Sequence, residues 1–106
     1  MAKYMVTASY SAEGARGLIK EGGKARVSAV TKLVEGLGGK IEAFYFAYGA
    51  NDAIIILDVP DTATGVALSL AVNSSGAVQL TSMPLITADE MDAACKKTVS
   101  YKAPGA

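Results

Sequence analysis

The chain has 106 residues, of which 51% are hydrophobic and 19% charged, and its ten basic and ten acidic residues cancel. This length and composition predict one globular domain, residues 1–106. A net charge of zero removes the attraction that dominates nonspecific nucleic-acid binding, so no nucleic-acid partner is expected. No apolar run approaches the ~20 residues that cross a bilayer, and the start of the chain lacks a signal peptide's apolar stretch. We therefore expect a cytoplasmic location and no membrane partner.

Histidine is absent, and Cys95 is the single cysteine. These two facts exclude an intrachain disulfide, a cysteine metal cluster, and Ser-His-Asp or Cys-His catalysis. The sequence accordingly predicts no metal site and no cofactor. Cys95 is expected to be a small core residue on an apolar helix face.

Two strands joined by a turn form the most apolar stretch of the chain. Residues 41–48 (IEAFYFAY) and 53–59 (AIIILDV) are rich in β-favouring types, and the turn between them predicts a hairpin. Residues 54–57 are apolar on both faces, so both faces need a cover. Helices of this small chain can cover one face, and a second copy of the protein can cover the other. A central strand in the core of a single chain is the alternative.

The N-terminal half predicts a strand followed by two helical segments. Lys3 to Tyr10 forms the strand, and Ser11 is a suitable N-cap for a short, irregular helix that the pair Gly22-Gly23 should break. Lys24 to Leu37 is the main amphipathic helix. The residues expected to face inward from it are Ala25, Ala29, Val30, Leu33, Val34 and Leu37.

The C-terminal half predicts a helix, a strand and a final helix. Residues 60–62 (PDT) form the entry of the first helix and offer an oxygen side chain as a cap. The buried stripe of this helix is expected to be Ala63, Val66, Ala67, Leu70 and Ala71. Residues 77–86 form the fourth strand, and Pro84 favours an edge position. A capping box, Thr87 with Glu90, begins a helix to about Lys97. That helix should turn Met91, Ala94 and Cys95 inward, and the tail is either frayed or held on a neighbouring subunit through Val99 and Tyr101.

The order of elements predicts an α+β fold of the ferredoxin-like βαββαβ type. Its four-stranded antiparallel sheet would carry helices on one face, with an extra short C-terminal helix. The core would span residues 3–92, and the final helix and tail residues 88–106. Because one sheet face is left open, we expect a homodimer or a higher oligomer formed through that face.

Three segments resemble the GYD-domain family of small bacterial proteins: residues 10–49, residues 52–61 (DAIIILDVPD) and residues 76–87 (GAVQLTSMPLIT). The resemblance covers about Tyr4 to Asp92. The family is named for a Gly-Tyr-Asp element at the strand turn, whereas this turn reads Gly-Ala-Asn-Asp, with Asn51 where the tyrosine falls. The resemblance implies the ferredoxin-like fold and a dimeric α/β barrel. It implies no activity, because the family's function is not established.

Polar residues near the hairpin and the first strand form the candidate ligand site. An arginine among tyrosines could hold a carboxylate or phenolate by a charge-assisted fork and aromatic contact. In the simpler interpretation, the tyrosines are amphipathic strand residues, the aspartate forms a turn and the arginine is solvated. The candidate ligand-binding residues are Tyr10, Arg26, Tyr45, Tyr48, Asn51 and Asp52.

Two functions are compatible with these features. The first is a non-enzymatic homo-oligomeric module that binds a small, partly apolar metabolite between sheet and helices. The second is a small cofactor-independent enzyme of the oxygenase or isomerase type, in which tyrosine, arginine and aspartate handle protons. Glu42, Asp58 and Asp61 could form an acid/base set, but carboxylates beside a helix entry are useful without catalysis. The missing histidine favours the non-enzymatic module, with no catalytic residue assigned.

Overall fold

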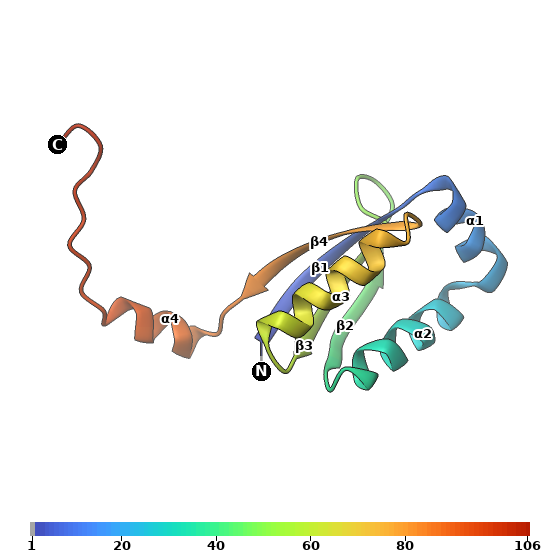
Figure 1. The fold of residues 1–106 in the computed structure, drawn as a ribbon, viewed down its shortest axis with the longest axis horizontal. Coiled ribbons are helices and arrows are strands. Elements are labelled where there is room, and N and C mark those ends of the chain that lie inside the picture. The colour runs from blue at the N-terminus through green and yellow to red at the C-terminus, as the bar shows by residue number, and fades with distance from the viewer. Residues whose placement is uncertain (1) are drawn as a thin grey trace.

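The computed structural model describes residues 2–106, and its strands form one antiparallel sheet over that range (Figure 1). The sheet has the strand order β2-β3-β1-β4, which is the ferredoxin-like arrangement that the sequence predicts. The elements are β1 (Ala2–Tyr10), α1 (Ala12–Glu21), α2 (Gly23–Gly36), β2 (Lys40–Phe46), β3 (Ala53–Val59), α3 (Thr62–Ser74), β4 (Val78–Leu85) and α4 (Ala88–Cys95). None of the helices among the described residues is long and apolar enough to cross a membrane.

The core lies between the sheet and the two helices α2 and α3, which cover the same sheet face (Figure 1). Alternate residues of β1 and β3 point to this face because side chains of a strand alternate between its two sides. Val6, Leu57 and Val59 are buried there and pack with Val34 of α2. Alternate apolar side chains of β3 thus lie in this core, and the others point to the opposite face of the sheet.

The sequence correctly predicts how the first two helices begin and end. The Ser11 hydroxyl caps α1 by accepting a hydrogen bond from the Gly14 N–H at 3.1 Å, and Gly22, at φ 86°, separates α1 from α2. The helix α1 is regular over its ten residues, although an irregular helix was expected. Its Gly14 is needed for close packing, because a Cβ atom there would lie 2.2 Å from the Ala77 carbonyl oxygen.

The prediction for the buried side of α3 is wrong. The outer face of α3 consists of the residues expected to be inside, namely Ala63, Val66, Ala67, Leu70 and Ala71, and all of them are exposed. The inner side is set by Gly65, whose missing side chain lets α3 approach the Tyr4 ring; a Cβ there would lie 3.2 Å from Tyr4 Cε2. Because α3 has no charged residue and its apolar residues are spread around the helix, periodicity alone cannot select its buried face. In α2, Val34 is buried and Val30 partly buried, but Ala25, Ala29 and Leu33 are exposed, as is the C-cap residue Leu37.

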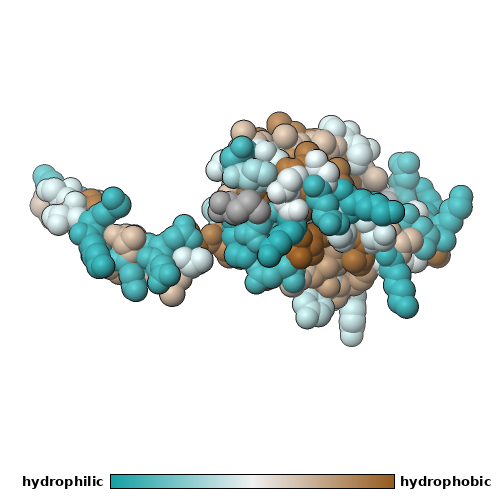
Figure 2. Space-filling view, turned by 90° about the horizontal axis from the view of Figure 1, so that it is seen from below, coloured by the Kyte–Doolittle hydropathy of each residue, from teal (hydrophilic) through white to brown (hydrophobic). Residues whose placement is uncertain are grey.

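The other face of the sheet is open in the single chain. The strand register places Ala43, Ile56, Met5 and Met83 in one apolar row across all four strands. The row beside it contains Tyr45, Ile54, Thr7 and Thr81. We call these two rows the open sheet face. Brown, apolar residues reach the surface on both the upper and the lower side of the body in Figure 2.

Residues 86–106, which we call the C-terminal arm, stand clear of the body in both views (Figures 1 and 2). All of these residues are exposed. The predicted capping box is confirmed, since the Glu90 N–H donates to Thr87 Oγ1 at 3.1 Å and the Thr87 N–H to Glu90 Oε1 at 3.0 Å. The prediction that Met91, Ala94 and Cys95 point inward is wrong, because α4 lies beyond the end of the sheet with no core beneath it.

Candidate functional site

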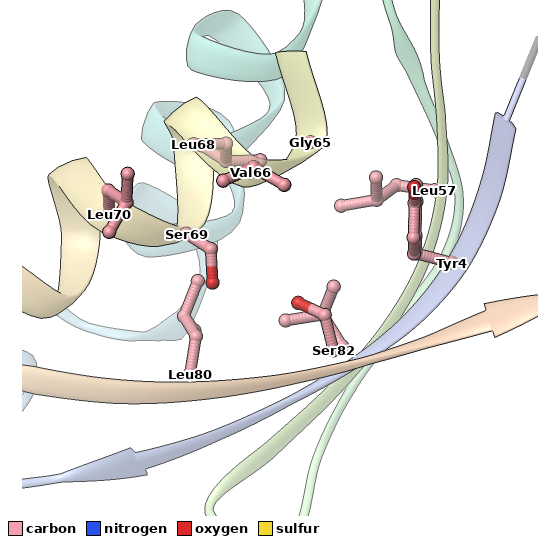
Figure 3. A pocket seen from close by; sticks show the side chains of 10 residues that line it. Tyr4, Leu57, Gly65, Val66, Leu68, Ser69, Leu70, Leu80 and Ser82 are labelled. Atoms are coloured by element: carbon pink, nitrogen blue, oxygen red, sulfur yellow. The ribbon is translucent and has the colours of Figure 1, made fainter. Parts of the chain in front are cut away.

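A cavity of about 230 Å³ lies between α3 and the strands beneath it (Figure 3). Its floor comes from β1, β3 and β4, and α3 forms one side. The cavity is open between α3 and the edge strand β4, since no further strand follows β4 in the sheet order over the described residues. The lining residues are Tyr4, Val6, Leu57, Gly65, Val66, Leu68, Ser69, Leu70, Leu80 and Ser82.

The polar groups of this cavity are three hydroxyls. Tyr4 comes from β1, Ser69 from α3 and Ser82 from β4, and Figure 3 shows the oxygens of the two serines facing the same space. None of the described residues that line the cavity carries a charge. Hydroxyls both donate and accept hydrogen bonds, so this set suits a neutral ligand with one or two polar atoms. The remaining walls are apolar and suit a hydrocarbon or aromatic body.

The wall formed by α3 is fixed at its N-terminus by Asp61. The Asp61 Oδ1 accepts hydrogen bonds from the Thr64 N–H at 2.8 Å and from the Thr64 hydroxyl at 2.7 Å. The hydrogen bond from the Thr64 backbone, with a further one from its side chain, holds the pKa of Asp61 below its usual value of 3.8. This carboxylate therefore has a structural explanation as a helix cap.

Two of the sequence-predicted site residues come together at the other end of the sheet. Tyr10 and Arg26 line one cavity of about 420 Å³ between α1, α2 and the end of α3, with the carboxylates Glu13 and Glu21 on the same walls. The carboxylates give this cavity mixed charge. It is therefore a poorer match than the α3 cavity to a partly apolar ligand.

Asp52 and Asn51 lie in the hairpin turn near the end of β1. The Asp52 Oδ2 accepts the Tyr10 N–H at 2.7 Å, and the Asp52 N–H donates to the Ala8 carbonyl at 2.7 Å. These bonds tie the hairpin to β1. Asp52 and Tyr10 also line a shallow cavity of about 320 Å³ beside α1, and Asn51 is partly buried.

Tyr45 and Tyr48 lie away from Tyr10 and Arg26. Tyr45 stands opposite Ile54 on the open sheet face, 71% exposed, and the Tyr48 side chain is fully exposed beyond β2. The structure thus brings Tyr10 together with Arg26 and with Asp52, and does not bring either strand tyrosine to them.

Glu42 and Asp58 converge on Lys3 at one end of the open sheet face. Lys3 Nζ pairs with Glu42 and lies 3.2 Å from Asp58 Oδ2. The hydrogen bond to Glu42, followed by that to Asp58, raises the pKa of Lys3 above its ordinary value. Asp61 instead caps α3, so each of the three carboxylates considered as an acid/base set has a structural partner.

The residues of the α3 cavity were not among the sequence-predicted candidates. Two signals point to them in retrospect. Gly65 and Ser69 recur four residues apart in a helix with no charged residue, which marks a face with room and a polar atom. Ser82 shares the inward face of β4 with Val78 and Leu80, where a purely structural strand would be apolar.

The fold and the cavity together define a small α+β protein with a ferredoxin-like sheet and an apolar, hydroxyl-lined cavity under one helix. The family model described as "GYD domain" matches residues 4–95, so the chain belongs to the GYD domain family. The match includes α4 and leaves out the tail. No curated protein and no solved structure shows significant similarity to this chain.

Proposed function

We propose that this protein is a non-enzymatic homodimeric module that binds a small, largely apolar molecule in the α3 cavity. The observation that carries the proposal is the cavity itself, about 230 Å³ of apolar wall with the three hydroxyls of Tyr4, Ser69 and Ser82. This volume lies below the ~300–1,000 Å³ of sites for drug-sized ligands. The ligand is accordingly a small molecule, such as a monocyclic or bicyclic alcohol or phenol.

Binding fits these residues better than catalysis. Proton transfer needs an acid or base whose charge state changes near the working pH, and histidine, carboxylates and lysine usually provide it. The described lining of the α3 cavity has hydroxyls alone as its polar side-chain groups. They can orient a ligand by hydrogen bonds, and the apolar walls supply most of the affinity.

The homodimer is supported by the open sheet face. A row of Ala43, Ile56, Met5 and Met83 crosses the whole sheet, and such a row is costly to leave in water. A two-fold axis brings the same surface of two copies together, so one apolar row covers its equivalent. Two sheets stacked in this way would form the dimeric α/β barrel that the resemblance to the GYD-domain family implies.

Binding is tested with 2-naphthol, a fluorescent aromatic alcohol that is small enough for the cavity. The protein has no tryptophan, so the fluorescence of the bound probe can be read without interference. Ser82→Leu fills the cavity and removes a hydroxyl, and we expect it to weaken binding by at least about tenfold. Thr81→Leu is the matched control, because neighbouring residues of β4 point to opposite sheet faces. Absence of binding to the wild type, or equal loss in both variants, would contradict the proposal.

The dimer is tested by Ile56→Glu, which places a carboxylate in the centre of the apolar row. Burying an unpaired charge is so costly that we expect this variant to sediment as a monomer. Gln79→Glu, on the same face of the edge strand outside that row, should leave the dimer intact. If both variants keep the wild-type size, the open sheet face is not the interface.

A further inference from the structure

Within residues 2–106, the outer face of α3 is left uncovered. It is formed by Ala63, Val66, Ala67, Leu70 and Ala71, with Val66 51% and Leu70 65% exposed. The whole helix, residues 62–74, has no charged side chain. Large apolar side chains such as Val66 and Leu70 are costly to leave in water, so covering this face with another apolar surface is favourable. It borders the open side of the α3 cavity, because Val66 and Leu70 also line that cavity.

The C-terminal arm also exposes apolar side chains that no other part of the described chain covers. Helical periodicity puts Ala88, Met91, Ala94 and Cys95 of α4 on one apolar side, with Asp92 at its border and Asp89 and Glu90 on the rest of the helix surface. A helix of eight residues is marginal in water without packing. Beyond it, Val99 and Tyr101 are 79% and 76% exposed. The arm therefore has the apolar side chains of a docking segment and no body beneath them.

The link between β4 and α4 directs the arm away from its own α3. It consists of Ile86 and Thr87, two β-branched residues that favour extended backbone. Thr87 is extended, at φ −80° and ψ 167°, and is held there by its capping box with Glu90. No glycine, asparagine or aspartate is available in this link to reverse the chain. The surface that receives the arm is therefore on another molecule.

We propose that the C-terminal arm of one copy packs on the outer face of α3 of a second copy and closes the open side of its α3 cavity. The inference rests on the function proposed for that cavity and adds the partner's arm to the site. Alanines on both helices allow the axes to approach to about 8–10 Å. The carboxylates of α4 stay in water, and the uncharged α3 face leaves no buried charge unpaired.

With the arms packed in this way, each binding site is formed by residues of two chains. Met91 of the arm is the largest side chain on the apolar side of α4, and in this arrangement it packs near Val66 and Leu70. A flexible thioether side chain fits an irregular apolar opening well. A ligand in the cavity is then sealed from water by a residue that its own chain does not supply.

The lone cysteine provides a direct test in the full chain. Wild-type protein is refolded together with variants that carry Cys95→Ser and one new cysteine, in turn Ala63→Cys, Val66→Cys and Leu70→Cys. Each chain then has one thiol, so a disulfide between unlike chains under mild oxidation reports contact between an arm and a partner's α3. We expect a one-to-one product, identified by mass, for at least one of the three positions. Lys32→Cys, exposed on α2, is the matched control and should give none.

Two outcomes would overturn the inference. One is the absence of the one-to-one product at all three positions. The other is a disulfide that forms within a single chain carrying Leu70→Cys and the native Cys95, independently of dilution, since it would place the arm on its own α3.

Ligand binding separates this inference from the proposed function. Met91→Asp should weaken 2-naphthol binding by about tenfold, the factor expected for losing a buried side chain of that size, while Asp92→Asn should leave it unchanged. A cross-link together with no 2-naphthol binding by the wild type would contradict the cavity's function alone. Binding that Met91→Asp does not alter, without a cross-link, would contradict the arm contact alone.

Discussion

The helices α2 and α3 cover the same face of the same sheet, yet charged side chains occur on the exposed surface of α2 and not on that of α3. The exposed side of α2 includes Lys24, Lys32 and Glu35, as expected for a helix that faces water. The exposed side of α3 has apolar side chains and no charge over thirteen residues. Two helices in the same layer thus differ in whether their exposed sides carry charged residues. Our proposal that a second copy covers the outer face of α3 rests on this difference.

The largest expected effect concerns how tightly α3 approaches the sheet. Gly65→Val places side-chain atoms against the Tyr4 ring and Val59, where a Cβ alone would be 3.2 Å from Tyr4 Cε2. We expect a loss of about 2 kcal/mol in the free energy of unfolding, the usual cost of overpacking. Urea denaturation measures it.

Gly36→Val at the end of α2 is the control for that change. Among the described residues, no atom outside the local backbone of its own helix and its two chain neighbours lies within 4 Å of a Cβ at this position, so the cost should stay below about 1 kcal/mol. Equal destabilisation by the two variants would show that α3 is no more closely packed than α2.

The next effect compares the outer faces directly. Ala67→Lys puts a charge on the exposed side of α3, and Ala29→Lys does the same on α2. If a second copy covers α3, the first change should raise the dissociation constant of the oligomer by about tenfold. The second should leave it unchanged. Analytical ultracentrifugation over a concentration series distinguishes them, and identical values would remove the distinction between the two faces.

The smallest expected effect is a loss of folding stability at acidic pH, and it comes from the different N-caps of α2 and α3. Asp61 caps α3 with a pKa held below 3.8, whereas the N-cap of α2 is Gly22, which makes no side-chain cap. A lowered pKa in the folded state means that the charged cap stabilises the fold above pH 3.8, and that this contribution disappears as the pH falls through the lower folded value.

Asp61→Asn keeps a capping oxygen and should flatten the pH dependence of stability in this acidic window, while Asp61→Ala should also lower stability at neutral pH. Thermal unfolding followed between pH 2 and pH 7 checks both. A wild-type profile as flat as that of Asp61→Asn would contradict the role of the carboxylate.

Much of this fold could be predicted from the sequence because its signals are local. Glycines at chain reversals, the caps Ser11, Asp61 and Thr87, and the alternation in β1 each act within a few residues. The inner side of α3 could not be predicted, because it is selected by the contact of Gly65 with Tyr4, sixty-one positions earlier in the chain. Likewise, no local sequence pattern shows that α4 lies away from the sheet and its covering helices.

The candidate site illustrates the same limit. Tyr10 and Arg26 meet because α1 and α2 follow β1 directly and return over its end. Tyr45 lies on the opposite side of the sheet, which depends on the bulge in β2 between Ile41 and Ala43 that shifts the alternation of that strand. The α3 cavity is assembled from three strands and a helix, so only the three-dimensional arrangement reveals it.

The central claim is that a second copy covers the surfaces that a single chain leaves apolar. Native mass spectrometry of the protein as purified from cells tests it most directly, with the same sample measured again under denaturing conditions. The account predicts a dimer or an even multiple of the 10.8 kDa chain, with any bound small molecule lost on denaturation. A monomer at micromolar concentration would contradict it, because the open sheet face and the outer face of α3 would then remain in water.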